Sequence, residues 1–299
     1  MKLKIAVFLS WLVAVLPASA QMKASLSYDY LSTSTLNDRY DNTYGDGNLS
    51  LFSGRFNLPL SFKMNEKRQP TMWNATLNMK YGILDNDDEA RFYNPNKIIN
   101  SGVTFSHIRP INNRWFMIAS LGAGIYASHD YIRLNSILAN GGLVFVYTMR
   151  NYLKIGFGGG LTTSFGAPMV MPMVYVSWER KGKYQFNIDF MGRLKVSAST
   201  FINPNLKLEL VGLEMDGISA VMKINGKSKI YSSTMLKSYL GATYQIDKHL
   251  GISVSAGVDW RRTANLRDRK INELFDFRDK TDRYFGTSFR STASLHYTF

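Results

Sequence analysis

Hydrophobic and polar residues alternate along most of the chain, in successive blocks of about ten residues. In residues 49–63, one face of the alternation is apolar and carries Phe52, Phe56, Leu58, Leu60 and Phe62. The block at residues 73–83 repeats this scheme. Side chains of a β-strand point alternately to opposite faces, so a period of two predicts strands with one apolar and one polar face. A helix, with 3.6 residues per turn, does not fit this pattern.

The alternating blocks predict the number of strands. The first block covers residues 23–30, and the last ends at Phe299. Between them, further blocks cover residues 98–109, 115–128, 139–150, 152–163, 168–180 and 183–195. Short polar turns alternate with longer connections, predicted at about 32–48, 85–96, 129–138, 196–203 and 263–283. This asymmetry is typical of a barrel with tight turns at one end and long loops at the other.

The segment from Asn205 to Tyr231 leaves the count open. Glu214-Met215-Asp216-Gly217 is either a turn between two strands or a bulge within one. The sequence therefore predicts an all-β fold, a transmembrane antiparallel up-and-down β-barrel of about 14 strands, with 12 as the alternative. A soluble β-sandwich would also show alternation, but it should have shorter blocks.

The first 20 residues have the pattern of a signal peptide. Lys2 and Lys4 form a charged start, residues 5–16 are apolar, and Ala18-Ser19-Ala20 provides a small-residue cleavage site. An uncleaved anchor is the alternative, but the apolar stretch is shorter than the roughly 20 residues that a spanning helix needs. We expect residues 1–20 to be a signal peptide and residues 21–299 to be the barrel domain.

Composition narrows the chemistry of the exported chain. The formal charge is +14, and removing the two signal lysines leaves +12, which favours anionic surroundings. Export makes nucleic acid an improbable partner, whereas lipid phosphates and anionic solutes remain available. The chain has no cysteine, which excludes a lipid-modified N-terminal Cys, a disulfide scaffold and a thiolate metal site.

The C-terminal residues Ser294-Leu295-His296-Tyr297-Thr298-Phe299 resemble the assembly signal of bacterial outer-membrane barrels. In that signal a terminal Phe follows aromatic or aliphatic residues at alternating positions, here Leu295 and Tyr297. The whole chain resembles porin-like barrels of a poorly characterised family. The resemblance implies a bacterial outer-membrane location, contact with outer-membrane lipid and lipopolysaccharide, and insertion by the barrel-assembly machinery through the C-terminal strand. The oligomeric state is left open.

Each face of the predicted barrel offers candidate residues. If the apolar face meets lipid, aromatic residues near the block ends form girdles at the membrane interfaces; these are Trp73, Tyr81, Trp115, Trp178, Tyr184 and Trp260. The polar face carries the predicted lumen cations Arg55, Lys80, Lys154, Arg193, Lys237, Arg261 and Arg290, against Asp189 and Asp259. Such an excess biases an open lumen toward anions. Alternatively, these cations pair with Asp189, Asp259 and the loops, and seal the barrel.

Catalytic chemistry finds little support in the sequence. His129-Asp130, with Asp85, Asp87 and Asp88 on another loop, resembles the rim of omptin-type surface proteases in residue type alone. The adjacent pairs Ser106-His107 and Ser128-His129 point to opposite faces of a strand, which argues against nucleophile-base pairing. We find no metal-ligand spacing, no nucleotide fingerprint and no cofactor site, and we expect no enzyme.

The leading hypothesis is a porin-like channel for passive passage of small polar or anionic solutes. A closed structural or surface-interaction barrel that binds lipopolysaccharide or protein is the alternative, and a surface hydrolase is a third. A hydrophobic-substrate channel of the fatty-acid-transporter type is a further alternative. Those barrels carry an N-terminal plug, whereas the alternation here begins at residue 23.

Overall fold

The structure is a computed structural model that describes residues 22–299, except 68, 88, 181–182, 191–192, 225 and 276–282. The predicted signal peptide, residues 1–20, lies outside the described residues.

Antiparallel strands make up nearly all of the described chain. The first eight are β1 (Lys23–Asp38), β2 (Thr43–Met64), β3 (Pro70–Asn86), β4 (Lys97–Pro110), β5 (Trp115–Ser128), β6 (Ile137–Arg150), β7 (Leu153–Thr162) and β8 (Met169–Arg180). The others are β9 (Tyr184–Phe190), β10 (Leu194–Asn203), β11 (Leu206–Ile224), β12 (Lys227–Gln245), β13 (Leu250–Thr263), β14 (Asn265–Asp268), β15 (Arg283–Phe285) and β16 (Ser288–Thr298). Short helical turns are α2 (Ala90–Tyr93), η1 (Leu134–Ser136) and η2 (Ile271–Phe275).

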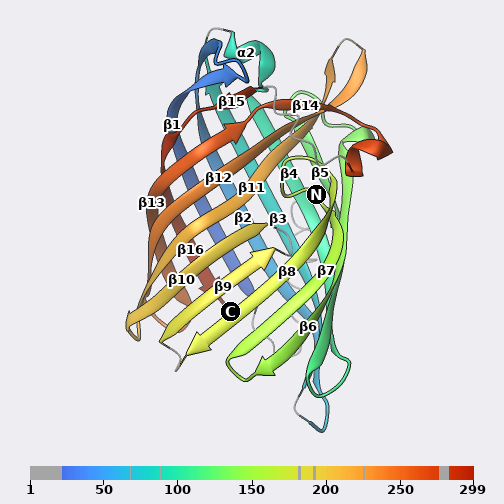
Figure 1. Cartoon of the computed structure of the whole chain (residues 1–299), viewed down its shortest axis with the longest axis vertical. Coiled ribbons are helices and arrows are strands. Elements are labelled where there is room, and N and C mark those ends of the chain that lie inside the picture. Colours follow the sequence, from blue (N-terminus) through green and yellow to red (C-terminus); the bar gives the residue numbers. More distant parts are fainter. Residues whose placement is uncertain are drawn as a thin grey trace, which may run out of the picture.

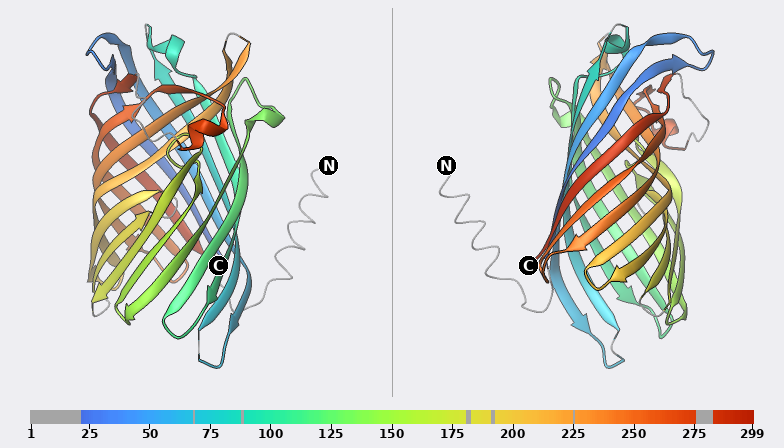
Figure 2. Two further views of the ribbon diagram at one scale, coloured as in Figure 1. Left: turned by 45° about the vertical axis from the view of Figure 1, so that its right-hand side comes forward. Right: turned by 90° about the vertical axis from the view of Figure 1, so that its left-hand side faces the viewer.

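The strands close into one barrel (Figures 1 and 2). Each strand from β1 to β13 pairs with its neighbour in sequence, and β16 pairs with both β1 and β13 to complete the cylinder. The short strand β14 continues β13 alongside β12, and β15 continues β16 alongside β1 and β13. The barrel therefore has 14 strands, as predicted. None of the helices described is long and apolar enough to cross a membrane.

The two ends of the barrel differ in their connections. Two- to four-residue links join β6 to β7, β10 to β11 and β12 to β13 at the end where the described chain begins and finishes, which we call the turn end. The opposite end, which we call the loop end, carries α2, η1 and η2 in its connections.

Some predicted boundaries were wrong. Residues 32–48 were expected to be a loop, but β1 and β2 run through most of them. The predicted strand at 183–195 is β9 followed by the start of β10, and the predicted loop at 196–203 is the rest of β10. The ambiguous Glu214-Met215-Asp216-Gly217 segment lies inside β11, next to a register shift between Val211 and Glu214.

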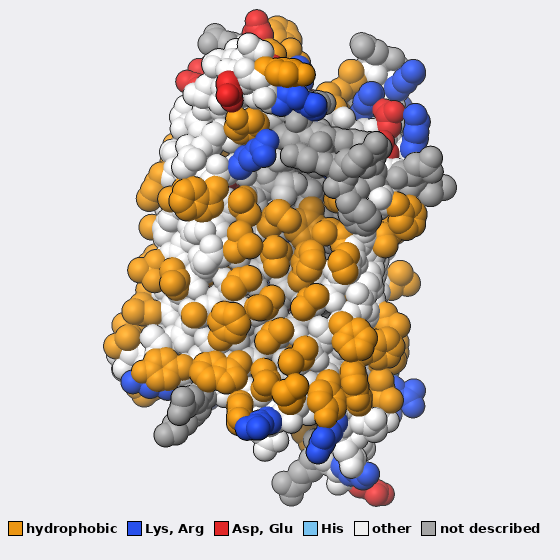
Figure 3. Space-filling view, in the orientation of Figure 1, with side chains coloured by type: hydrophobic (Ala, Val, Ile, Leu, Met, Phe, Trp, Pro, Cys, Tyr) orange, Lys and Arg blue, Asp and Glu red, His pale blue; other side chains and the backbone are white. Residues whose placement is uncertain are grey.

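The outer face is apolar, and Figure 3 shows it as a broad hydrophobic belt with Lys and Arg near both ends. Four of the predicted girdle residues lie near strand ends at the turn end: Trp73, Trp115, Trp178 and Tyr184. The Trp73 ring stacks on His107 at 4.1 Å between centroids. Trp260 lies near the other end of β13, and its Nε1 donates to Ser238 Oγ at 2.9 Å. Tyr81 lies within β3, opposite Phe52 and Ile99.

The inner face changes polarity halfway along the barrel. On β1 the inward positions are Ser25, Ser27 and Asp29 toward the turn end, and then the buried Leu31. On β2 the buried Leu49 and Leu51 give way to Ser53 and Arg55. The apolar half forms one packed cluster that also includes Leu84, Ile98, Ile218, Ala220, Tyr231, Met235 and Phe285. The lumen is therefore filled by an apolar core toward the loop end.

The wall itself is uneven. Strands β7 to β10 are short and end halfway up the barrel in Figure 1. Beyond Met215, which pairs with Leu194, β11 has no β10 partner, and it instead makes a parallel bridge with β5 at Val221 and Ala127. The loop between β7 and β8 packs beside it, because Thr234 and Ser232 hydroxyls both donate to the Phe165 carbonyl, at 2.6 and 3.5 Å.

Candidate functional site

A polar cavity of about 750 Å³ occupies the barrel between its middle and the turn end. Its lining comes from the inward positions of most strands, with many Ser, Thr and Asn side chains, for example Ser27, Thr76, Asn78, Ser101, Thr104, Asn140, Ser255 and Thr292. His296, near the end of β16, marks its lower limit, and Asn100 and Gly217 lie at its upper limit. The cavity is thus the empty half of the lumen, and the apolar cluster fills the other half.

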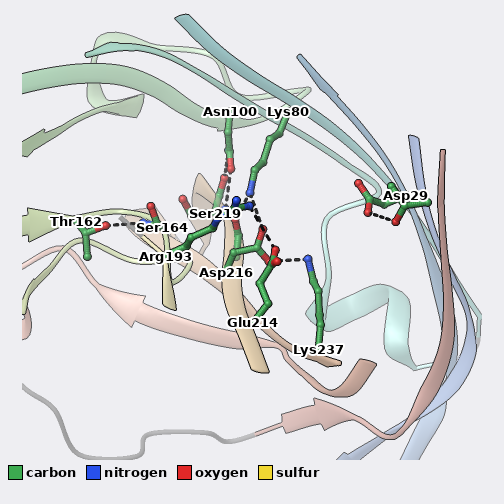
Figure 4. A network of polar contacts seen from close by, with 12 residues as sticks. Asp29, Lys80, Asn100, Thr162, Ser164, Arg193, Glu214, Asp216, Ser219 and Lys237 are labelled. Carbon is green, nitrogen blue, oxygen red and sulfur yellow. Dashed lines mark hydrogen bonds and ion pairs between the residues drawn. The ribbon is translucent and has the colours of Figure 1, made fainter. Parts of the chain in front are cut away.

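A layer of ion pairs closes the cavity at mid-height, shown in Figure 4. Asp216 on β11 accepts from Lys237 on β12 at 2.6 Å and from Lys80 on β3 at 3.2 Å. Glu214 faces Arg193 at 3.5 Å and accepts from the Tyr239 hydroxyl at 2.6 Å. These contacts join the β11–β12 hairpin to the opposite wall. Figure 4 shows Lys80 of β3 extending across the lumen to Asp216 of β11.

A further ion pair completes the layer. Arg290 on β16 donates to Asp29 on β1, and the guanidinium also lies over the Tyr239 ring at 4.5 Å. Thr292 Oγ1 donates to the same Asp29 oxygen at 2.7 Å. The pair is nearly sealed from water, with side chains 6% and 10% exposed. Buried charges of opposite sign stay ionised only when paired in this way.

Five of the seven predicted lumen cations line the cavity: Arg55, Lys80, Arg193, Lys237 and Arg290. Asp189 lines it too, whereas Asp259 is fully buried and is not among the lining residues. Lys154, near the turn end of β7, is exposed and is not among the residues that line this cavity. Arg55 is exposed and makes no ion pair within 4 Å among the described residues.

Arg261 lies outside the lumen because β13 contains a bulge. Leu236 pairs with Arg261 but Lys237 pairs with Asp259, so Trp260 is an extra residue that breaks the alternation. The Arg261 guanidinium lies over the Tyr284 ring at 4.2 Å. Its neighbour Arg262 points inward instead, is 2% exposed, and stacks over the Phe285 ring at 3.8 Å.

Sequence reasoning missed four of the anions. Besides Asp189, the described lining contains Asp29, Glu209, Glu214 and Asp216. Its five carboxylates balance its five cations, so the expected excess of seven cations over two anions is not found. Asp29 shared its face with Ser25 and Ser27 in a recognised strand and could have been identified. The other three lie in the segment whose strand assignment was ambiguous.

The candidate catalytic residues are not assembled into a site. Ser106 lines the cavity, whereas His107 stacks on Trp73 on the outer face. The backbone N–H of His129 donates to the Lys97 carbonyl, and Asp87 accepts from the Asp46 backbone at 2.6 Å. Asp88 lies outside the described residues. Among the described residues, no group of three or more His, Asp or Glu could hold a metal ion.

Comparisons with known proteins agree with this architecture. Residues 16–298 match the family described as Domain of unknown function (DUF6268). No curated protein matches the chain. The COG4313 outer membrane channel from Pseudomonas putida F1 is similar in structure, with a TM-score of 0.50 and 10% identity over 95% of this chain and 100% of that one. A Pseudomonas aeruginosa FadL homologue aligns with a TM-score of 0.45 and 11% identity, over 93% of this chain and 90% of that one. At 10% identity the likeness to the COG4313 channel shows the fold alone, which is that of an outer-membrane channel.

Proposed function

Since the chain belongs to the DUF6268 family and folds as an outer-membrane barrel, we propose that it is a porin-like channel for passive passage of small polar solutes across a bacterial outer membrane. The observation that carries the proposal is the polar cavity of about 750 Å³ inside the barrel. Its volume lies in the range of about 300–1,000 Å³ that small-molecule sites have. A barrel that served only as an anchor would gain packing energy by filling this space.

The cavity lining favours polar solutes over apolar ones. Hydroxyl and amide side chains line its walls, and the ion-pair layer lies at its end. Passage of an apolar solute would leave these groups without hydrogen-bond partners. Because the cations of the layer are paired with carboxylates, Arg55 is the lumen cation best placed to attract an anion.

Permeation measurements test the proposal. We expect the purified protein in planar bilayers to carry a small ion current, and in liposomes to admit small sugars. Replacing Arg55 by Glu should lower the anion-to-cation permeability ratio severalfold, measured as a shift in reversal potential, because it inverts a fixed charge in a narrow low-dielectric lumen. Lys154→Glu is the matched control, since Lys154 lies outside the cavity.

The second candidate is a closed structural or surface-interaction barrel. The apolar cluster around Leu31, Leu49 and Phe285 favours it, because these fully or almost fully buried side chains fill the lumen toward the loop end. Absence of current from the wild type and from every variant described below would decide for this candidate and against the channel.

A further inference from the structure

The barrel holds a second cavity at its loop end. This cavity has a volume of about 310 Å³ and is lined by residues of α2, β4, β11 and the connection after β5, including Arg91, Lys97, Asp130, Tyr131, Met222 and Lys223. Three of these six are cations and one is an anion. The first cavity, at mid-barrel and below, is lined in part by the same strands β4, β5 and β11. The two cavities therefore lie one above the other along shared strands.

The barrier between them is short along β4 and β5. On β4, Asn100 lines the first cavity and Lys97 the second; on β5, Tyr126 lines the first and Ser128 the second. With a rise of about 3.4 Å per residue, two to three residues correspond to roughly 7–10 Å. On β11 the barrier consists of residues 218–221, between Gly217 and Met222.

This part of β11 is buried on both faces. Residues 216–221 are all buried, as are residues 230–233 of the partner strand β12, whereas a wall strand such as β1 has no such run. Ala220 packs in the apolar cluster of the lumen, while Val221 packs with Leu138 and Ile230 on the other side. The segment is therefore an internal partition and has no side exposed to lipid.

Few bonds hold the partition against the opposite wall. Where β10 ends, the free edge of β11 is held by one bridge, Val221 to Ala127, and by side chains. The Asn100 amide makes the main side-chain contact. Its Nδ2 donates to the Ser219 carbonyl at 2.5 Å, and its Oδ1 accepts from the Ser219 N–H at 3.1 Å. Lys80 Nζ donates to the Gly217 carbonyl at 3.1 Å. A ladder between full strands would supply many more bonds.

Two hydroxyl groups at the partition are unsatisfied in this closed arrangement. Ser219 Oγ and Ser233 Oγ are buried and have no hydrogen-bond partner among the described residues. A buried hydroxyl without a hydrogen-bond partner is unfavourable, and water entering the lumen would satisfy both groups.

Building on the proposed channel function, we infer that the two cavities are parts of one solute pathway, that residues 217–221 of β11 are its gate, and that Asn100 is the latch that holds the gate closed. Solutes enter through the loop-end cavity, and its basic lining favours polar solutes that carry an anionic group. The path opens when β11 moves away from β4 and β5. Asn100 acts as a positioning residue, because it holds β11 rather than selecting the solute.

Removing the latch tests the inference. Asn100→Ala deletes both hydrogen bonds to Ser219, and we expect the open probability in planar bilayers to rise at least about tenfold, which corresponds to roughly 1.4 kcal/mol. The matched control is Asn78→Ala, because Asn78 lines the same cavity without reaching β11. Heat-modifiable electrophoretic mobility identifies the fraction of each variant that is folded. Equal currents from both variants would overturn the role of Asn100.

A reversible crosslink locates the path. The chain has no cysteine, so a disulfide can be introduced alone. Val221 and Ala127 are bridge partners, about 4.8 Å apart as neighbouring strands are, which suits a disulfide. In the Asn100→Ala background, oxidised Ala127→Cys/Val221→Cys should lose the added current and regain it on reduction. The control pair Ala119→Cys/Leu143→Cys joins β5 to β6 in the permanent wall and should not respond. A current that persists through the oxidised β5–β11 crosslink would overturn the gate.

A labelling experiment separates the gate from the channel function. Ser219→Cys places a thiol where the side chain is fully buried. A water-soluble maleimide should modify it slowly when Asn100 is present and at least several times faster in the Asn100→Ala background. Faster labelling without any current would retain the movement of β11 but reject conduction. Current that is accompanied by unchanged labelling would retain the channel and reject the gate.

Discussion

At the scale of single residues, the mid-barrel layer depends on Asp216. This carboxylate faces both Lys237, whose side chain is 3% exposed, and Lys80. Asp216→Asn leaves the buried Lys237 ammonium without this partner, and breaking a buried ion pair by removing one member costs about 3–5 kcal/mol. We expect a loss of that size in the free energy of unfolding, measured by urea denaturation in lipid vesicles and followed by tryptophan fluorescence.

The control for this loss lies at the barrel surface. Asp268 pairs with Lys229 at 3.1 Å, but both side chains are at least one-third exposed to solvent. Asp268→Asn should therefore cost less than about 1 kcal/mol. Equal losses for the two variants would show that burial adds nothing to the Asp216 interaction.

Residue type and alternation predicted most of the cations of the site, but they missed most of its anions and therefore its balance of charge. Arg55 and Lys80 could be assigned to the lumen because both lie in regular strands. Glu214 and Asp216 could not be assigned in this way. Pairing with β10 and β12 decides whether they lie in a turn or in a strand, and this pairing is a tertiary property. The ion-pair layer depends on contacts between strands far apart in sequence, and no local pattern records such contacts.

At the scale of strands, bulges limit what alternation can predict. A single extra residue reverses the facing of every later side chain. Trp260 is such a residue in β13, and it places Arg262 inside the barrel where a strict period of two would place Arg261. By contrast, the bounds of β5 agree with the predicted block at 115–128, since β5 pairs with β4 and β6 without a register shift.

The glycines of β7 provide a test at this scale. A Cβ at Gly158 would lie within van der Waals distance of the Leu143 carbonyl and of Val144 Cα on β6, and both are backbone atoms that cannot turn away. Gly158→Ala should therefore destabilise the barrel by about 1–3 kcal/mol. At Gly159, on the other face, a Cβ meets Met171 O at an ordinary 3.5 Å, so Gly159→Ala should be tolerated. The temperature at which electrophoretic mobility changes compares the two, and a lower value for the Gly159 variant would contradict this account.

At the scale of the whole molecule, the barrel departs from a simple rule of polar inside and apolar outside. The outer belt follows the rule, and so does most of the inner face below mid-height, apart from the buried cluster of Val144, Val146 and Met173. Above it, apolar residues occupy both faces of the wall, for example Leu49 and Leu51 on the inner side of β2. The sequence contained this signal, since Leu49 and Leu51 share a face with Ser53 and Arg55. An apolar inner half means that the lumen closes by packing, which ties any conduction to movement of the loop-end half.

Closure of the barrel brings the first and last strands together, and this makes the role of the C-terminus testable. Phe299 N–H donates to the Met22 carbonyl at 2.9 Å, and β16 pairs with β1 from Thr298 to Arg290. Phe299 and Phe289 are similarly exposed, at 52% and 54%, at the two ends of the last strand. If the terminal aromatic residue is read by the assembly machinery, Phe299→Ala should lower the amount of folded barrel in the outer membrane of cells several times more than Phe289→Ala. Both variants should fold equally well from urea into detergent, where no machinery acts. A folding defect of Phe299→Ala in detergent as well would assign this residue to barrel stability instead of recognition.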